Sequence, residues 1–408
     1  MKTSYNIATL SCGMRVIHIP ATSPVVYSGI AVAAGSRHEA PGEEGVAHFC
    51  EHVTFKGTRR RSALQILNCL ESVGGDLNAF TNKEDTVYYA AIQREHFTRA
   101  VDLLADIVFC SVYPQQEIAH EVDVICDEIE SYNDSPAELI YDEFENLLFQ
   151  GHPLGHNILG TREGVSRFTA DHARRFTARH YRPGRAVFFA YGDISFTQLV
   201  RRLEAFEGYG ARSGAPSADE AMPAVACPPA ARLEAAHHQA HVMLGCRTFG
   251  YDDARRMPLF LLNNLLGGPG MNARLNLSLR ERHGLVYTVE STTATYSDTG
   301  CWTVYFGCDH HDVKRCLHLV RRELDCVMQH PLGTRQLAAA KRQLKGQLTI
   351  ACDNREQFAL DSAKHFLHYG RERSIDELLA QIDAVTAQQL QDVAQQLFAP
   401  DRLQQLCL

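Results

Sequence analysis

The alternation of apolar and polar positions changes its period repeatedly along the first half of the chain. Residues 14–19 and 25–34 show the short period and β-branched content of strands, and the Cys12-Gly13 pair predicts a turn before the first. Longer, helical periods follow over residues 45–55, 62–73, 96–110 and 115–132. A strand pair is expected over 76–92, around a polar centre at 81–85, and a buried strand over 186–191.

The second half repeats this order after a change of composition. Between residues 208 and 229 the chain turns to Gly, Ala, Ser and Pro, which predicts a linker. A strand near 241–246, a helix at 257–266 and strands around 287–306 follow, and helices fill most of the remainder. We therefore expect an α+β protein of two related domains, each of about 200 residues with a mainly antiparallel sheet packed with helices. The expected boundaries are 1–207, a linker at 208–231, and 232–408, and an ancient duplication would explain the matching order.

Charge and composition narrow the function classes. The 408 residues carry a formal net charge of −8, which argues against a general nucleic-acid binder. Arg59-Arg60-Arg61 is a short basic run, for which a solvated loop is the favoured interpretation. No stretch approaches the roughly 18 apolar residues of a membrane span, so no membrane association is expected.

Cysteine usage and the first residues suggest a compartment. Thirteen cysteines are scattered without a CxxC pair, as expected of reduced and mostly buried thiols. The first five residues contain neither an apolar signal core nor an Arg-rich presequence. A cytoplasmic location is the resulting prediction.

The segment His48-Phe49-Cys50-Glu51-His52 carries the candidate chemistry. On a helix, positions i, i+3 and i+4 share a face, so His48 and His52 can grip one metal ion while Glu51 points to the same side. Two imidazoles, a third protein ligand and an open position suit catalytic zinc, with the carboxylate as the base that takes a proton from water. Such an H-x-x-E-H pentapeptide arises by chance in about one comparable chain in twenty. Incidental histidines on a solvated or capped helix are the alternative that the pentapeptide alone leaves open.

A helical pair of glutamates lies downstream of this segment. Glu128 lies 76 residues beyond His52, and Glu121 lies seven residues before it on the same helical face. With this interval the sequence resembles the inverted zinc peptidases, the family of pitrilysin, insulysin and the mitochondrial processing peptidase. The resemblance implies one Zn²⁺ per chain held by His48, His52 and Glu128, with Glu121 orienting the site. Asp127 and Glu130 are rival ligands if the register differs.

Two further segments extend the resemblance. One of them, Asn78-Ala79-Phe80-Thr81, resembles the family's edge strand, which pairs with the substrate backbone. Without the family, the same segment is only a hairpin with a polar centre. Residues 279–287, after the glycine-rich turn at 267–270, resemble the family's C-terminal signature. There the resemblance implies that Arg280 holds the substrate chain and that Tyr287 donates to the developing oxyanion. Without the resemblance, a helix-end Arg and a core Tyr are the alternative roles.

The resemblance also carries expectations about assembly and substrate. Family members enclose a chamber between four such domains, and this chain has two, forming half of a clamshell. The resemblance therefore implies a dimer. A homodimer with composite active sites is the simplest form, and a heterodimer with a degenerate partner fits as well. A closed chamber implies cleavage of short or unfolded peptides. A non-catalytic scaffold or peptide-holding subunit, and a hydrolase of non-peptide amides, are the competing functions.

Cys50 and two pairs of adjacent histidines are the remaining candidate groups. We expect Cys50 to be a small residue of the core. The alternative hypothesis is that alkylation or oxidation of its thiol inhibits the enzyme. The adjacent pairs His237-His238 and His310-His311 lack helical ligand spacing and are expected to be surface or loop residues.

Overall fold

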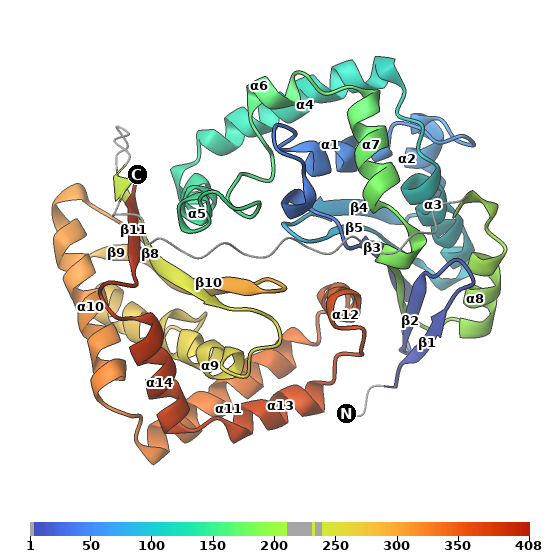
Figure 1. Ribbon diagram of the computed structural model, residues 1–408. Helices are drawn as coiled ribbons and strands as arrows, with labels where there is room; N and C mark the ends of the chain where they lie inside the picture. The colour runs from blue at the N-terminus through green and yellow to red at the C-terminus, as the bar shows by residue number, and fades with distance from the viewer. Residues whose placement is uncertain (1–3, 210–230, 233–238) are drawn as a thin grey trace. The chain divides into compact units, whose positions relative to one another are not determined.

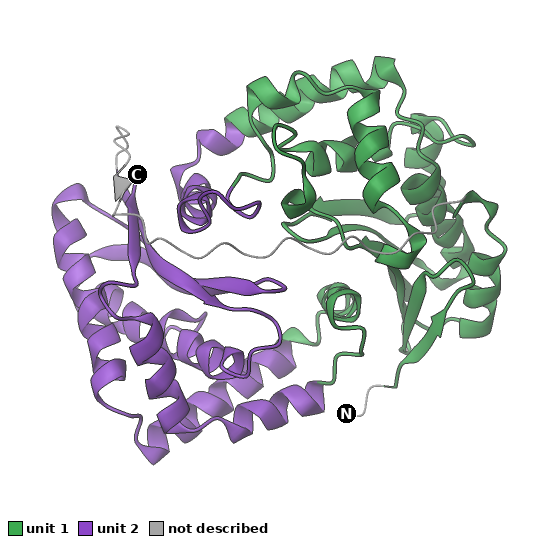
Figure 2. Ribbon diagram, in the orientation of Figure 1, with its two compact units in different colours: residues 1–130, 156–220, 351–374 green, residues 131–155, 221–350, 375–408 purple. Residues whose placement is uncertain are grey.

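The computed structural model describes residues 4–209, 231–232 and 239–408, which form two compact units (Figure 2). Unit 1 contains Met1–Glu130, His156–Glu220 and Ala351–Ser374; unit 2 contains Ser131–Gly155, Ala221–Ile350 and Ile375–Leu408. Most of the expected linker, residues 210–230, lies outside the described residues, as does His237-His238. The linear domain boundaries therefore stay a prediction.

Unit 1 is built on a six-stranded sheet (Figure 1). Its strands run in the order β1-β2-β6-β3-β5-β4, and only β2 and β6 pair in parallel. The strands are β1 (Asn6–Thr9), β2 (Arg15–Pro20), β3 (Val25–Val32), β4 (Asp76–Thr81), β5 (Thr86–Gln93) and β6 (Ala186–Gly192). The helices are α1 (Val46–Thr54), α2 (Ala63–Glu71), α3 (Phe97–Cys110), α4 (Gln115–Asn133), α6 (Arg162–Val165), α7 (Ala170–His180), α8 (Phe196–Glu204) and α12 (Arg355–Tyr369).

Unit 2 is built on a five-stranded sheet of the order β7-β11-β8-β10-β9. The strands are β7 (Ala231–Arg232), β8 (Ala240–Phe249), β9 (Val286–Thr295), β10 (Thr299–Cys308) and β11 (Gln404–Cys407). The helices are α5 (Pro136–Leu148), α9 (Arg256–Gly267), α10 (Val313–Gln329), α11 (Thr334–Ala351), α13 (Ile375–Ala384) and α14 (Ala387–Leu397), with a π-helical turn at Asn276–Glu281. The apolar faces of α9, α10 and α14 pack into one core against the sheet.

The two sheets share a strand order. The sequence β2-β6-β3-β5-β4 in unit 1 corresponds to β7-β11-β8-β10-β9 in unit 2, and in both the only parallel pair is the first one. The predicted α+β class and the related architecture of two sheet-and-helix domains are confirmed. The predicted strands and helices all occur, with boundaries shifted by a few residues at most.

Each sheet is covered on its second face by a helix from the opposite part of the sequence. Helix α12, late in the chain, packs on β2, β3 and β6 of unit 1, and the early helix α5 packs on β8, β10 and β11 of unit 2 (Figures 1 and 2). Arg15 of β2 donates to the carbonyls of Phe366 and Leu367 at 2.9 Å each, while Phe144 of α5 is fully buried. The sequence pattern did not predict this exchange, because amphipathicity shows that a helix has an apolar face but not which sheet it covers.

The structure also tests what was expected of the basic run at Arg59-Arg60-Arg61, of the cysteines and of membrane spans. Arg61 is not a solvated loop residue, because its guanidinium pairs with the buried carboxylate of Asp106. Every cysteine in the described ranges is a free thiol, as expected. In the described residues, no helix combines the length and apolar character needed to cross a bilayer.

Candidate metal centre

Helix α1 is held at its start by a buried carboxylate. Glu39, whose side chain is completely buried, accepts hydrogen bonds from the backbone N–H of Gly45 at 2.9 Å and of Ala47 at 2.7 Å. His156 Nε2 contacts the same carboxylate at 2.8 Å. Burial raises the pKa of Glu39, although these hydrogen bonds oppose that effect. A negative group at a helix N-terminus is favourable, and here it orients the helix that carries the histidines.

Three ligand atoms converge between α1 and α4. His48, His52 and Glu128 each offer one donor atom, and these atoms all lie within 4.8 Å of one another. Glu128 Oε2 lies 3.8 Å from His48 Nε2 and 3.4 Å from His52 Nε2. The two imidazoles stand edge to face, with ring centroids 4.6 Å apart. Two nitrogens and one carboxylate oxygen are the donor set that zinc takes in catalytic sites, so these residues fit the expected metal.

Glu121 contacts the ring nitrogen of His52 that does not face Glu128. Its Oε1 lies 2.9 Å from His52 Nδ1, and its Oε2 lies 2.5 Å from Lys56 Nζ. A proton on Nδ1 directed at Glu121 leaves the Nε2 lone pair for a metal, which is the usual arrangement of a carboxylate behind a metal-binding histidine. Lys56 balances the charge of Glu121 and lies four residues after His52, just beyond the end of α1 at Thr54.

The two histidines have opposite electrostatic environments. Burial lowers the pKa of His48 to about 4, helped by the neighbouring His52, so His48 is neutral. Burial also disfavours charged His52, but hydrogen bonds to Glu121 and Glu128 outweigh it and raise the pKa of His52 to about 9. The hydrogen bond to His52 in turn lowers the pKa of Glu128. A metal ion at this site would have to displace the His52 proton, which couples metal affinity to pH.

Glu51 lies beside the metal group and is held by the edge strand. Thr81 Oγ1, at the end of β4, donates to Glu51 Oε2 at 2.6 Å. Burial raises the pKa of Glu51, whereas the Thr81 hydrogen bond and the charge of His52 lower it. A carboxylate with a raised pKa close to a metal group is suited to accept a proton near neutral pH.

The rival carboxylates lie elsewhere. Glu130 pairs with Arg162, and Asp127 is exposed and outside the metal group. The structure therefore places Glu128, and neither of the two rival carboxylates, beside the two histidines.

The remaining predicted residues lie in both units. Asn78, Ala79 and Phe80 belong to β4, which is the outermost strand of its sheet, so the edge position is confirmed and substrate pairing stays a prediction. Arg280 and Tyr287 belong to unit 2, and the Tyr287 side chain is 85% exposed. The alternative of a core tyrosine is therefore wrong.

The accessory candidates are mostly structural. Cys50 is fully buried with Sγ 3.9 Å from the Ala173 carbonyl, and burial raises the pKa of its thiol well above the ordinary value, which supports the core interpretation. In the described ranges, one further group has metal-ligand spacing and consists of Asp309, His311 and Asp312. This group lies at the surface, as expected for the His310-His311 pair.

Sequence reasoning missed the supporting residues. Lys56 had a local signal in its spacing of four residues from His52, although it lies just beyond the end of α1. Glu39 and His156 had none, because they are 117 positions apart and only the fold brings them together.

Comparison with known proteins shows which family the chain belongs to. Residues 15–162 match the family model described as insulinase (peptidase family M16), and residues 167–344 match the M16 inactive domain. The chain is 36% identical, over 95% of its length and 85% of the relative, to an uncharacterized zinc protease of Streptomyces coelicolor. This chain belongs to the insulinase family, M16. The resemblance noted from the motifs is thereby confirmed.

Other family members match along their whole length. The uncharacterized zinc protease YmxG of Bacillus subtilis is 32% identical, over 96% of this chain and 95% of the relative. Among solved structures, an M16 inactive domain protein from Pseudomonas fluorescens has a TM-score of 0.90 at 20% identity, covering 99% of this chain and 97% of that one. A protease from Helicobacter pylori has a TM-score of 0.89 at 19% identity, covering 100% and 99%. These structures support the fold.

Proposed function

We propose that this protein is a zinc-dependent endopeptidase that hydrolyses short or unfolded peptides, with one Zn²⁺ per chain. The observation that carries the proposal is the convergence of His48 Nε2, His52 Nε2 and Glu128 Oε2 beside the Glu51 carboxylate. Relatives named zinc proteases, at 30–36% identity, support the same metal.

Each residue of the group has a role in this proposal. His48, His52 and Glu128 would hold the zinc, which when bound supplies a Lewis acid that polarises the scissile carbonyl and acidifies water. Glu51 takes the proton from that water and passes it to the leaving amine. Thr81 keeps the Glu51 carboxylate oriented, and Glu121 keeps His52 Nε2 directed at the metal.

Substrate binding is assigned to the open edge of β4. An extended peptide can add beside Asn78, Ala79 and Phe80 through backbone hydrogen bonds, which demand little of its sequence. That binding mode suits peptides without stable structure. Efficient degradation of a stably folded protein would contradict the proposed substrate class.

Metal analysis combined with peptide cleavage tests the proposal. Wild-type protein should bind one zinc per chain and cleave a quenched-fluorescence peptide library, and His52→Ala should lose both. The exposed His318 gives a matched control, because His318→Ala removes an imidazole from α10 and should change neither. Wild-type protein with neither zinc nor cleavage would favour the non-catalytic scaffold instead.

Our proposal for the assembly is a homodimer with two composite sites. Arg280 and the exposed Tyr287 would act on the substrate bound at the metal group of the partner subunit. Mixing inactive Glu51→Gln with inactive Tyr287→Phe protein should then restore activity through subunit exchange. No recovery after demonstrated exchange would contradict action in trans, and detection of an essential different subunit would favour a heterodimer. The cytoplasmic location stays a prediction.

A further inference from the structure

Helix α12 places a cation beside the outermost strand of the unit 1 sheet. The ammonium of Lys364 lies over the ring of Phe80, 5.6 Å from the ring centroid, and both residues belong to unit 1. Phe80 is one of the β4 residues to which substrate pairing is assigned, and it is partly exposed. A cation held in this place can interact with the side chains of a peptide that pairs with β4.

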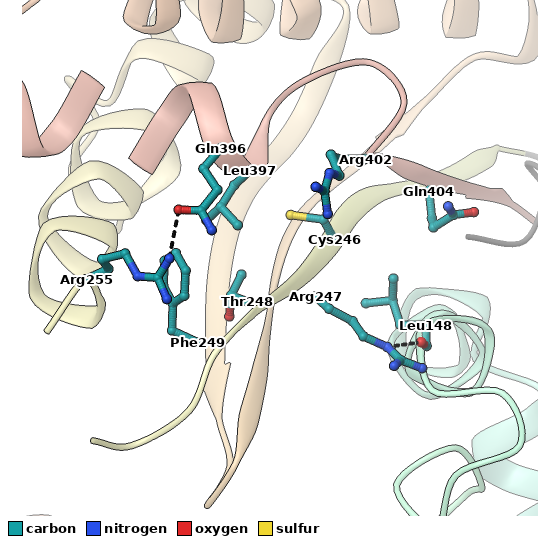
Figure 3. Close-up of a pocket in the computed structure, with 10 residues that line it drawn as sticks. All are labelled: Leu148, Cys246, Arg247, Thr248, Phe249, Arg255, Gln396, Leu397, Arg402 and Gln404. Carbon is teal, nitrogen blue, oxygen red and sulfur yellow. Dashed lines mark hydrogen bonds between the residues drawn. The ribbon is translucent and has the colours of Figure 1, made fainter. Parts of the chain in front are cut away.

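Lys364 differs from two other cations that lie over aromatic rings. Arg247 and Arg255 of unit 2 do so at 4.8 and 4.2 Å. Arg247 donates to the carbonyl of Leu148, and Arg255 donates to Gln396 Oε1 at 3.0 Å (Figure 3). Among the residues that the structure describes, the ammonium of Lys364 has no hydrogen bond, and no carboxylate lies within ion-pair distance of it.

The charge of Lys364 also acts on Asp85, but this carboxylate already has partners. Asp85 is buried, and its oxygens contact His368 Nε2 at 3.0 Å and Asn82 Nδ2 at 2.7 Å. Lys364 itself is half-buried. It is therefore a partly desolvated cation whose countercharge a bound peptide can supply.

The backbone of β4 determines which residue of a bound peptide lies beside this cation. The N–H of Asn82 donates to the Asp85 carbonyl at 2.8 Å, on the side of β5. In an antiparallel strand the backbone groups of every second residue share a side, so those of Phe80 also face β5, and those of Ala79 and Thr81 face the open edge. The peptide residue opposite Phe80 therefore forms a close pair without backbone hydrogen bonds.

The side chain of that peptide residue lies on the α12 face of the sheet. Phe80 packs with side chains of α12 in one cluster, whereas Ala79 packs against the cluster on the other face, which includes α1. Residues directly opposite each other on neighbouring strands direct their side chains to the same face. A carboxylate on the residue opposite Phe80 can therefore reach the ammonium of Lys364.

The next position on the same face has the opposite charge. Asn78 pairs with Tyr89 of β5, whose hydroxyl bonds the carboxylate of Glu356 in α12. Burial raises the pKa of Tyr89 to about 12, and Glu356 and Asp76 add to this shift. An acidic side chain opposite Asn78 would meet these carboxylates, so a preference for acid is confined to one position of the peptide.

We propose that Lys364 is a specificity-determining residue, which selects peptides with Glu or Asp at the position opposite Phe80. The inference rests on the proposed peptidase function and deepens it, because it names peptides with an acidic residue near the cleaved bond as the substrate class. Thr81, the neighbour of Phe80, bonds the Glu51 base. The acidic residue therefore lies within about two residues of the cleaved bond.

Cleavage of matched peptides tests the selection. Each quenched-fluorescence peptide differs from its partner only by Glu in place of Gln at one position, which is moved through three residues on either side of the cleaved bond. For wild-type protein, Glu should raise kcat/KM at least about fivefold at one position, as expected for a single ion pair. Lys364→Gln should remove this preference, and Lys364→Glu should favour Lys there. Lys314→Gln, at an exposed position of α10, should retain the preference for Glu.

Binding without cleavage separates this inference from the proposed function. Full-length protein with Glu51→Gln is titrated against fluorescein-Gly-Thr-Ala-Glu-Ala-Thr-Ala-amide or its Gln counterpart, and fluorescence anisotropy gives the affinities. The Glu peptide should bind about fivefold more tightly, and adding Lys364→Gln should remove the difference, with the unfolding temperature as the folding control. If wild-type protein cleaves no peptide, the proposed function fails, and this affinity ratio still tests Lys364.

Three results would overturn the role of Lys364. They are equal affinity for the Glu and Gln peptides, no measurable binding of either, and a preference for Glu that persists in Lys364→Gln. Active wild-type protein that cleaves Glu and Gln peptides equally at every position would overturn it as well.

Discussion

Helix α1 of unit 1 and helix α9 of unit 2 each follow the corresponding central strand of their sheets, β3 and β8. In α9 the buried Asn263 accepts a hydrogen bond from Trp302 Nε1 at 3.0 Å, and its carbonyl accepts one from Ser291 at 3.1 Å. In α1 the buried His48 has no partner for Nδ1 in the described chain, and its Nε2 faces Glu128. The buried Asn263 of α9 is satisfied within the core, whereas the buried His48 of α1 directs its Nε2 at the carboxylate of Glu128.

The difference between α1 and α9 shows how two related sheet-and-helix units use a buried polar side chain, one for stability and the other for a candidate site. A polar group in a protein interior is stable when it is hydrogen-bonded, and costly otherwise. The helix whose buried polar side chain is hydrogen-bonded within the core stabilises its unit, and the helix whose ligand atoms face Glu128 offers a site. The two sheets differ as well, because β6 pairs with β3 up to Val32 whereas β11 pairs with β8 only from Val242 to Gly245.

The largest effect is expected from Glu51→Gln in α1. The amide keeps the shape of the side chain and can still accept from Thr81, but it cannot take a proton. Peptide cleavage should fall by about 10²–10⁴-fold, the usual contribution of a general base. Steady-state kinetics on a quenched peptide measures this, with zinc content and unfolding temperature as controls that should not change. Undiminished cleavage by a zinc-loaded variant would remove Glu51 from the mechanism.

Phe144→Ala tests the exchange of helices between the units. Phe144 is fully buried between α5 and the unit 2 sheet, and its truncation should cost about 3–5 kcal/mol of stability. Hydrogen exchange should rise in β8, β10 and β11, which α5 covers. If exchange rises in β3 and β6 instead, the assignment of α5 to unit 2 is wrong.

Asn263→Leu is the counterpart of Glu51→Gln in α9. It leaves the buried Trp302 N–H without an acceptor, so stability should fall by about 1–3 kcal/mol. Denaturant unfolding measures the loss, and the change in tryptophan fluorescence reports the site directly because Trp302 is the chain's single tryptophan. Zinc affinity should stay unchanged. A loss of zinc with stability intact would show that α9 is not purely structural.

Thr81→Val should have the smallest effect, on pH dependence. The Thr81 hydrogen bond stabilises ionised Glu51, so its removal raises the pKa of that carboxyl. Because the base must be ionised, the acidic limb of kcat/KM should move to higher pH, by roughly half to one unit for a hydrogen bond of about 1 kcal/mol. Thr81→Ser keeps the hydroxyl and should restore the profile. An unmoved limb would mean that Thr81 does not tune Glu51.

The sequence by itself determined the parts of this protein that depend on local spacing. His48, Glu51 and His52 share a helical face at any position in any fold, and the Glu121–Glu128 interval follows from the same helical period. The strand and helix order followed from apolar periodicity, and the repeated order predicted two related domains. The approach of Glu128 to the histidines was predicted by family resemblance, since spacing alone leaves Asp127 and Glu130 open.

Tertiary structure alone decided the contacts that join distant segments. The capping of α1 by Glu39 and His156, the Thr81–Glu51 hydrogen bond, the exchange of α5 and α12, and the short pairing of β11 with β8 all depend on long-range packing. A residue's local pattern reports whether it is buried but not against what, because many partners satisfy the same apolar face or carboxylate. The metal motif could therefore be predicted from the sequence, whereas the contacts that orient it required the tertiary structure.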